Sequence, residues 1–347
     1  MNAPSTHEEA SRVDGARLVA DIGGSNARFG WLSPGSRQPE HIATLVVAEH
    51  AGLAATLAAY LDGIKEKIGP EYREPRAAAL AVATAVGSDV IAFTNNAWSF
   101  SQLALRRAFG LEYLVVLNDF EALALALPHL RDGQLRSHGA RPTGTGTMAV
   151  IGPGTGLGVA GVLATAHGYV AIPGEGGHAT LAAGNEFEAE LLAIVRRSFG
   201  HVSAERLLSG IGLPVLHAAV RQALQAGTAA EGATLETQQI IAEGLAGDAV
   251  CRCTLDVFCA LLGGFASNVA LTLGARGGVF IGGGIVPRLA DLFFASEFRN
   301  RFEDKGRLRP YLQAIPTALI TDTLVALTGA TAALEPQGTP VLVSRSA

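Results

Sequence analysis

An aspartate followed by a glycine turn ends the first apolar run of the chain, and this order suits nucleotide chemistry. Asp21 closes the run 18–20, and the residues Gly-Gly-Ser-Asn at 23–26 precede a second apolar run. The order predicts a strand, a tight turn and a second strand. A carboxylate at a strand end can hold a divalent cation, while turn N–H groups and the Ser25 hydroxyl face phosphate oxygens. The alternative is an ordinary β-turn with a spare aspartate.

Two later glycine turns favour the nucleotide interpretation. The strand-like run 148–151 leads into Gly-Pro-Gly-Thr-Gly-Leu-Gly at 152–158, and the run 278–281 leads into three glycines at 282–284. Glycines at such junctions let a phosphate or a flat ring lie against the backbone, near a helix N-terminus. Neither of the two commoner phosphate-loop motifs occurs in the chain. The three turns together predict two similar α/β lobes that close on one nucleotide.

A second aspartate stands where a general base is needed. Asn118 and Asp119 end the apolar run 113–117. A carboxylate at a strand end can accept a proton from an attacking hydroxyl, which phosphoryl transfer requires. Local sequence alone equally supports Asp119 as the N-cap of a helix over 120–127. The two roles are compatible.

Polar groups suited to a polyol follow in the second half of the chain. Glu175 and His178 flank two glycines, and Glu205 follows on a Ser-Ala-Glu-Arg segment. Glutamate accepts and histidine donates hydrogen bonds, so a site of this kind can pair several hydroxyls and reject analogues that lack one. From the residues alone, a solvated helix glutamate is the favoured interpretation of Glu205, and a structural histidine is the favoured interpretation of His178. Glu175 and His178 are not expected to form a metal site, because no further metal ligand lies at helical spacing from them.

Composition narrows the class of protein. The chain has 347 residues, 49% of them hydrophobic, which is long for one average domain and suits two lobes. The net charge of −5 and the lack of a basic run argue against nucleic-acid binding. Three cysteines without a signal peptide predict free thiols in a reducing compartment. The apolar stretch 257–273 contains Gly, Ser and Asn, which favours a buried helix over a membrane span.

Periodicity places these residues on alternating strands and helices. Strands are predicted at 18–22, 27–32, 42–47, 78–83, 114–118, 147–151 and 318–321, and helices at 51–68, 99–109, 120–127, 186–198, 203–209, 213–226, 236–246, 248–274 and 324–334. Residues 131–146 are rich in Arg, Gly and Thr and are predicted to form a loop. Polar residues 1–16 are predicted to be a mobile N-terminal tail.

The motifs resemble those of the bacterial glucokinases, in the hexokinase/actin/Hsp70 superfamily. The resemblance rests on residues 21–28, 117–120, 152–158, 173–178, 200–206, 282–288 and 302–307, in the family's order from about residue 17 to about residue 335. Ser25 replaces the family's usual threonine, and Ala85 and Ser88 replace a proline and a glycine. The cysteine-rich zinc motif of the related repressor/open-reading-frame/kinase (ROK) family does not follow His178, which indicates the group without zinc.

The resemblance implies a fold, an activity and a set of roles. The fold is α/β, a two-lobed ribonuclease-H-like (actin-like ATPase) fold with an ATP/sugar cleft between a small domain (17–129 plus about 318–337) and a large domain (130–317). The activity is ATP-dependent phosphorylation of D-glucose to glucose 6-phosphate, the opening step of glycolysis. Asp119 is the catalytic base; Asn118, Asp119, Glu175, His178 and Glu205 bind the sugar; Asp21, Gly23, Gly24, Ser25, Asn26, Gly154, Thr155, Gly283 and Gly284 bind ATP; Asp21 holds Mg²⁺ through water.

The resemblance also implies a cytoplasmic homodimer whose partners are glucose and ATP, with no nucleic acid and no membrane. Two alternatives stay open. One is a kinase for another hexose or an amino sugar, and the other is a catalytically silent, sugar-responsive regulator, because fold alone does not fix function. An intact Asp21 and Asp119, and the lack of a basic N-terminal domain, argue against the regulator.

Overall fold

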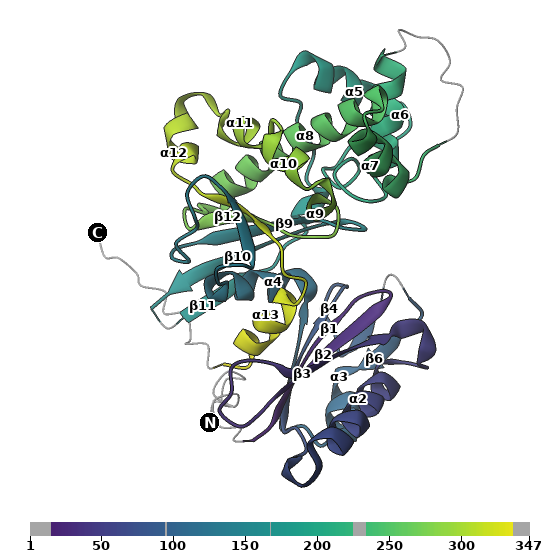
Figure 1. The fold of residues 1–347 in the computed structure, drawn as a ribbon, viewed down its shortest axis with the longest axis vertical. Coiled ribbons are helices and arrows are strands. Elements are labelled where there is room, and N and C mark those ends of the chain that lie inside the picture. The colour runs from purple at the N-terminus through teal and green to yellow at the C-terminus, as the bar shows by residue number, and fades with distance from the viewer. Residues whose placement is uncertain (1–14, 94–95, 167, 225–233, 336–347) are drawn as a thin grey trace. The chain divides into compact units, whose positions relative to one another are not determined.

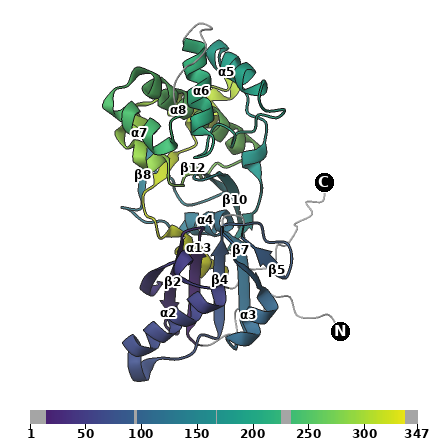
Figure 2. The same ribbon diagram turned by 90° about the vertical axis from the view of Figure 1, so that its right-hand side faces the viewer.

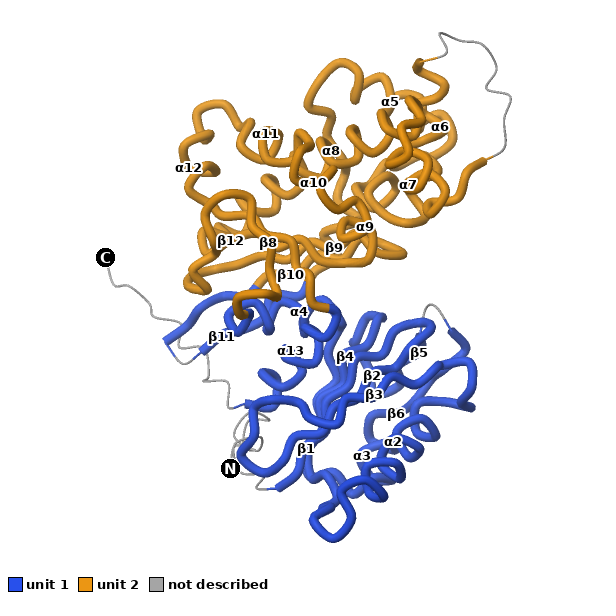
Figure 3. The backbone as a smooth tube through the Cα atoms, viewed as in Figure 1, with its two compact units in different colours: residues 1–130, 162–173, 323–347 blue, residues 131–161, 174–322 orange. Residues whose placement is uncertain are grey.

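The chain forms two compact units. The structure, a computed structural model, describes residues 15–93, 96–166, 168–224 and 234–335. Unit 1 comprises residues 1–130, 162–173 and 323–347, and unit 2 comprises residues 131–161 and 174–322 (Figure 3). Each unit is an α/β layer structure with its own sheet (Figures 1 and 2).

Unit 1 is built on a five-stranded sheet in the order β3-β2-β1-β4-β7. Its strands are β1 (Arg17–Ile22), β2 (Asn26–Leu32), β3 (Glu40–Val46), β4 (Ala77–Val82) and β7 (Tyr113–Asn118). The strands β1, β4 and β7 run parallel, and β2 and β3 continue the sheet in antiparallel fashion. The interior strand β4 is apolar throughout and fully buried, as expected for a strand covered on both faces.

Helices cover both faces of this sheet. The helices of unit 1 are α2 (Leu53–Ile68), α3 (Gln102–Ala108), α4 (Asp119–Ala126) and α13 (Val325–Ala333), and the short hairpin β5 (Val90–Ala92) and β6 (Ser99–Ser101) lies beside them. On one face, Phe29 stacks on Tyr60 of α2, with ring centroids 5.1 Å apart. On the other face, Leu327 and Ala330 of α13 pack on Val19.

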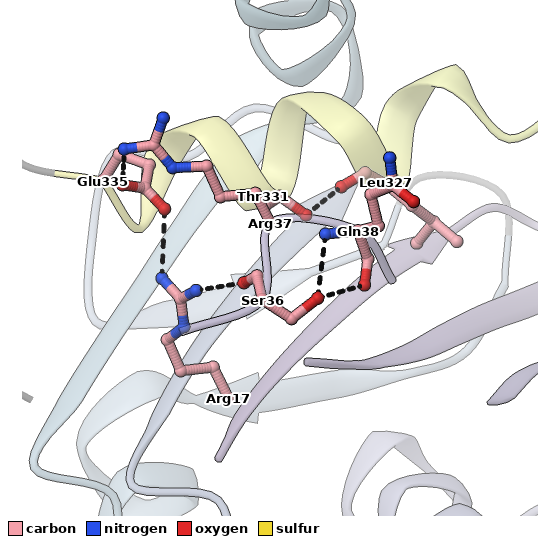
Figure 4. Close-up of polar contacts among 7 residues, drawn as sticks. All are labelled: Arg17, Ser36, Arg37, Gln38, Leu327, Thr331 and Glu335. Atoms are coloured by element: carbon pink, nitrogen blue, oxygen red, sulfur yellow. Dashed lines mark hydrogen bonds and ion pairs between the residues drawn. The ribbon is translucent and has the colours of Figure 1, made fainter. Parts of the chain in front are cut away.

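The last helix of the chain is fixed to unit 1 by a glycine contact and by an ion-pair cluster. A Cβ at Gly329 would lie 1.6 Å from the Ala122 carbonyl oxygen, so α13 and α4 approach at a distance only glycine permits. Beyond α13, the Glu335 carboxylate accepts hydrogen bonds from Arg17 (3.2 Å) and Arg37 (3.1 Å) (Figure 4). These contacts tie the end of the described chain to the start of β1.

The second sheet has six strands in the order β11-β10-β9-β12-β13-β8. They are β8 (Leu135–His138), β9 (Met148–Pro153), β10 (Leu157–Thr165), β11 (Gly168–Ile172), β12 (Gly278–Ile281) and β13 (Thr317–Ile320), and β10 runs on into residues assigned to unit 1. The strand β12 lies parallel to β9 and β13. The carboxyl ends of β9 and β12 therefore meet at one edge, where ligands of parallel sheets bind.

The helices of unit 2 surround one long central helix. They are α5 (Glu186–Arg196), α6 (Leu213–Leu224), α7 (Thr237–Ala246), α8 (Ala249–Leu273), α9 (Val286–Leu289), α10 (Asp291–Ala295), α11 (Phe298–Glu303) and α12 (Arg309–Gln313). α8 begins at the cap Asp248 and ends at Gly274, which takes the left-handed conformation. By length and composition α8 is apolar enough to cross a membrane, yet most of it is buried in the unit 2 core, as predicted.

Several predicted elements differ from the structure. Residues 203–209 form turns and not a helix, because their backbone groups bond to neighbouring segments. The predicted loop 131–146 contains β8, a short edge strand that pairing with β13 stabilises. The strand predicted at 318–321 was assigned to the small domain, but the observed strand at 317–320 belongs to the second sheet. Only the residues from 323 onward, which include α13, belong to unit 1.

The predicted tail lies mostly outside the described residues. Its last residue, Ala16, is buried, and the Ala16 carbonyl accepts a hydrogen bond from the Arg76 N–H (3.0 Å). The ordered part of unit 1 therefore begins at or before Ala16, and the predicted boundary at residue 16 is slightly too late.

Candidate active site

The carboxylate of Asp21 is paired across the first hairpin of unit 1. Asp21 stands opposite Arg28 in the β1–β2 register, and Arg28 Nη1 donates to Asp21 Oδ2 at 3.0 Å. Burial raises the pKa of Asp21, and the positive charge of Arg28 opposes that rise. Arg28 keeps a negative charge tolerable at this position, a role that its place in the motif did not reveal. The signal was the tight turn at 23–26, which fixes a hairpin register that sets Arg28 on β2 directly across from Asp21 on β1.

The turn that follows Asp21 is tight and partly exposed. The N–H of Gly23 donates to the Asn26 carbonyl at 2.9 Å, and the N–H of Val47 donates to the Ser25 carbonyl at the same distance. The side chains of Ser25 and Asn26 are exposed, while Gly23 and Gly24 are half-buried. A Cβ on Gly23 would meet only the Asn26 carbonyl oxygen, at an ordinary 3.6 Å. The space beside Gly23 is therefore open, as expected where a phosphate approaches the backbone.

Asn118, the last residue of β7, caps helix α4, and Asp119 is the first residue of that helix. The Asn118 side chain accepts from the Phe120 N–H (2.9 Å), and Glu121 accepts from the Asn118 N–H (2.9 Å), which completes a capping box. The Asn118 amide also donates to the Thr84 carbonyl at 3.2 Å. The N-cap position considered for Asp119 thus belongs to Asn118, and Asp119 Oδ1 also accepts from the Phe120 N–H at 3.0 Å.

Asp119 and Asp21 influence each other at one edge of the sheet. The ends of β1, β4 and β7 share that edge, because Ile22 is opposite Val82 and Val82 is opposite Asn118. Burial, and secondarily the negative charge of Asp21, raise the pKa of Asp119 to about 7. A carboxylate with such a pKa is half ionised near neutral pH, where a general base works best. Raised pKa values of this kind concentrate at functional sites.

The glycine hairpin of unit 2, residues 152–158, is closed by its own backbone and held by a second turn. The Gly154 N–H donates to the Gly156 carbonyl (2.8 Å), and Thr155 at the tip is exposed. The Gly282 N–H donates to the Ile151 carbonyl (2.8 Å), which brings the triple-glycine turn alongside this hairpin.

The triple-glycine turn needs glycine at its centre. Gly283 has a φ of +75°, and a Cβ there would lie 2.3 Å from the Pro153 carbonyl oxygen. Gly283 and Gly284 are exposed beside the hairpin. Unit 2 therefore brings together the four residues predicted there for ATP: Gly154, Thr155, Gly283 and Gly284.

The sugar candidates of unit 2 are connected to the same hairpin through Glu205. Glu175 and His178 are exposed; Glu175 precedes the short 3₁₀ turn Gly176–His178, and His178 ends it. Glu205 Oε1 is 3.8 Å from His178 Nε2, and Glu205 Oε2 accepts from the Leu157 N–H at 2.8 Å. Glu205 is thus neither a solvated helix glutamate nor isolated from the phosphate hairpin. Local sequence reasoning did not foresee its contact with Leu157.

Among the described residues, no group of three or more His, Cys, Asp or Glu side chains could enclose a metal ion. Mg²⁺ commonly takes only one or two carboxylates and completes its shell with water and substrate phosphates. Asp21, partly exposed and adjacent to an open glycine turn, fits that pattern.

Comparison with known proteins identifies the family. The family model "Glucokinase" matches residues 18–337. Glucokinases of Aromatoleum aromaticum and Chromobacterium violaceum are each 49% identical to this chain, covering 92% of it and 94% and 89% of their own lengths. The crystal structure of a glucokinase from an Antarctic psychrotroph is 36% identical, with a TM-score of 0.83, covering 93% of this chain and 99% of that one.

These likenesses agree with the site described above and with the architecture of both units. They confirm the predicted two-lobed α/β fold of the hexokinase/actin/Hsp70 superfamily. The chain therefore belongs to the glucokinase family, which confirms the family and the enzyme class that the sequence predicted.

Proposed function

We propose that this chain transfers the γ-phosphoryl group of ATP to the 6-hydroxyl of D-glucose, with Asp119 as the general base. The observation that carries the proposal is the Asp119 carboxylate, which lies at the start of helix α4 beside Asp21 and whose pKa burial raises to about 7. Family membership supplies the activity, ATP-dependent phosphorylation of glucose. The base assignment rests on chemistry.

Phosphoryl transfer requires mainly that the reacting groups are positioned and that the charge on the phosphates is stabilised. Asp119 accepts the proton of the glucose 6-hydroxyl while the oxygen of that hydroxyl bonds to the γ-phosphorus of ATP. The bond between that phosphorus and the leaving ADP oxygen breaks. Asp119 must be ionised to do so, and its pKa of about 7 makes the ionised form abundant at slightly alkaline pH. Asn118 positions this carboxylate, because its side chain fixes both the helix start and the Thr84 segment.

Sugar recognition falls to groups already paired only in part. The Asn118 amide donates to the Thr84 carbonyl and interacts with the Asp119 carboxylate, and its oxygen accepts from Phe120, so a sugar hydroxyl at Asn118 would share a polar group that is already oriented. Glu175, His178 and Glu205 supply acceptors and a donor from unit 2. A rigid hexose satisfies several such groups at once, and a sugar that lacks one hydroxyl leaves a polar group unpaired.

Nucleotide recognition uses backbone more than side chains. Gly23, Gly24, Ser25 and Asn26 present the first turn, Gly154 and Thr155 the second, and Gly283 and Gly284 the exposed strip beside it. Asp21 would hold Mg²⁺ through water, and that ion would neutralise charge on the phosphates. Arg28 then orients the Asp21 carboxylate through the 3.0 Å contact.

The direct test is a coupled assay for ADP release from the purified chain. We expect glucose to stimulate ADP release far above the rate with ATP alone, and mannose, glucosamine and N-acetylglucosamine to give a lower kcat/KM. Preference for one of those sugars would identify a kinase for another hexose or amino sugar. Glucose binding by calorimetry without turnover on any sugar would identify a regulator. Omitting Mg²⁺, with EDTA present, should abolish turnover.

Three wider expectations belong to the same proposal. The family resemblance favours a homodimer, which light scattering after size-exclusion chromatography would test. The three cysteines, all on α8, form no disulfide, in keeping with a reducing cytoplasm. The partners are then the two substrates, without a nucleic acid or a membrane.

A further inference from the structure

One segment of unit 2 contacts both the sugar candidates and the phosphate hairpin. We call residues 202–212 the Glu205 turn and residues 174–181 the Glu175 loop. Three backbone hydrogen bonds join them: Glu205 N–H to the Gly177 carbonyl (2.8 Å), Ala204 N–H to the Ala179 carbonyl (2.9 Å) and Leu181 N–H to the Val202 carbonyl (3.0 Å). The Glu175 loop is therefore held in place by the Glu205 turn.

The same turn holds the hairpin at 152–158. The Gly210 N–H donates to the Gly154 carbonyl at 2.7 Å, and the Ile211 N–H donates to the Thr155 carbonyl at 3.4 Å. A Cβ on Gly210 would lie 3.0 Å from the Gly154 carbonyl oxygen, so the two backbones touch. The tip of the hairpin that is predicted to face phosphate thus rests on the Glu205 turn.

The side chain of Glu205 also connects the hairpin to the sugar candidate His178. Its Oε2 accepts from the Leu157 N–H (2.8 Å), while its Oε1 lies 3.8 Å from His178 Nε2. A Cβ on Gly156 would lie 2.5 Å from Oε2, so the hairpin closes tightly around the carboxylate. A hydrogen bond to an ionised acceptor is stronger than one between neutral groups, which makes this a substantial restraint on the hairpin.

We propose that Glu205 is a positioning residue for the phosphate hairpin, and that it couples sugar occupancy to nucleotide affinity within unit 2. The inference rests on the proposed function. A sugar hydroxyl that donates to Oε1 fixes the carboxylate in the orientation that the Leu157 N–H requires. Because a ligand shifts an equilibrium only through contacts that differ between states, glucose should then raise the affinity for ATP, and ATP should raise that for glucose by the same factor.

Calorimetric titration with Mg²⁺ and AMP-PNP, a non-hydrolysable ATP analogue, tests this without turnover. The key measurement is the nucleotide Kd with glucose absent, and the second is that Kd at saturating glucose. The variants are Glu205→Met, which removes the acceptor; Glu205→Gln, which keeps a carbonyl oxygen for Leu157; and His178→Asn, which alters only the Oε1 side. Circular dichroism and thermal melting check that each variant folds.

We expect Glu205→Met to weaken AMP-PNP binding about 5- to 30-fold even without glucose, since it removes a charge-assisted hydrogen bond from the hairpin. Glu205→Gln should stay within about threefold of wild type in that measurement and lose most of the glucose-dependent gain. His178→Asn should leave the glucose-free Kd unchanged. A glucose-free Kd in Glu205→Met equal to that of wild type would overturn the positioning role.

Amide hydrogen exchange of the wild-type protein keeps the inference testable if Glu205→Met fails to fold. Saturating glucose should slow exchange in a peptide that spans residues 152–158, and a control peptide from the far end of α8 should not change. Unaltered exchange in the hairpin would refute the coupling. Failure of the proposed function looks different, because the wild-type protein would then not phosphorylate glucose, whatever the nucleotide Kd of the variants.

Discussion

The two glycine hairpins share a sequence pattern, yet their glycines serve different purposes. In unit 1, a Cβ on Gly23 would meet the nearest atom at 3.6 Å, and the turn lies next to the charged pair Asp21 and Arg28. In unit 2, a Cβ on Gly156 would lie 2.5 Å from Glu205 Oε2, and a Cβ on Gly283 would lie 2.3 Å from the Pro153 carbonyl oxygen. Glycine in the first turn leaves room for a ligand, whereas in the second it lets protein segments pack against one another.

The two regions should therefore contribute differently to catalysis. Unit 1 holds the carboxylates Asp21 and Asp119, so its contribution is mainly charge and proton transfer. In unit 2, the hairpin, the triple-glycine turn and the Glu205 turn are joined by backbone hydrogen bonds, so its contribution is mainly a rigid cradle. Substitutions of the two unit 1 carboxylates should therefore mainly change turnover, and substitutions in the unit 2 cradle should mainly change binding and stability.

The largest effect is expected at Asp119. Asp119→Asn removes the proton acceptor and keeps the shape, so kcat should fall by about two to four orders of magnitude while glucose Kd changes less than about tenfold. Steady-state kinetics and calorimetry measure the two quantities. Turnover close to wild type would show that another group takes the proton.

The same variant has an independent signature in stability. The pKa of Asp119 is raised from 3.8 to about 7 in the folded state, so its stabilising contribution is fully present below about pH 4 and is lost as pH rises through 7. Asp119→Asn cannot ionise, and its Tm should exceed that of wild type by a few degrees at pH 8, with a smaller difference at pH 5. Equal melting curves at both pH values would contradict the raised pKa.

Substitutions in the Glu175 loop should change sugar affinity. Glu175→Gln and His178→Ala each remove a hydroxyl contact that exists in the ground state, so the glucose KM should rise about 10- to 100-fold with a smaller change in kcat. Measuring the glucose and ATP KM values side by side gives the control. A change confined to the ATP KM would reverse the assignment of sugar and nucleotide residues.

Alanine substitutions compare the two glycine turns directly. Gly283 has a positive φ and faces the Pro153 carbonyl, so Gly283→Ala should lower the Tm clearly and weaken AMP-PNP binding. Gly23→Ala has room in the protein and should melt like wild type, yet weaken AMP-PNP about tenfold if phosphate approaches the backbone there. Normal nucleotide affinity in Gly23→Ala would remove the first turn from the nucleotide site.

Sequence predicted the strands, the glycine turns and the family because these depend on local pattern. Alternation sets Asp21 at a strand end, and glycine clusters mark turns wherever the chain reverses. Contacts between distant segments were not predictable. The helix expected at 203–209 yields to turns because Gly210 and Glu205 bond to the hairpin at 152–158, and the edge strand β8 exists only through pairing with β13. The cap role of Asn118 in place of Asp119 depended on a single residue of helix register.

The smallest expected effect is on the pH dependence of thermal stability, which should again differ between the two units. His138 of unit 2 lies against the rings of Phe293, Phe294 and Phe298, with ring centroids 5.0, 4.6 and 5.4 Å away. Burial, and then the positive charge of Arg299, lower the pKa of His138 to about 4. Asp119 in unit 1 shifts in the opposite direction, so the two units should respond oppositely to acid.

The sign for His138 follows from linkage. Because the pKa of the folded state lies below the ordinary 6.5, the unfolded chain binds a proton between pH 6.5 and 4 that the folded chain does not. The stabilising contribution of neutral His138 is therefore present above pH 6.5 and is lost as pH falls toward 4. His138→Phe keeps an aromatic ring in the cluster and cannot be protonated, so its Tm should fall less than that of wild type, by a few degrees, between pH 7.5 and pH 5. An equal fall in His138→Phe and wild type would place the acid sensitivity of unit 2 elsewhere.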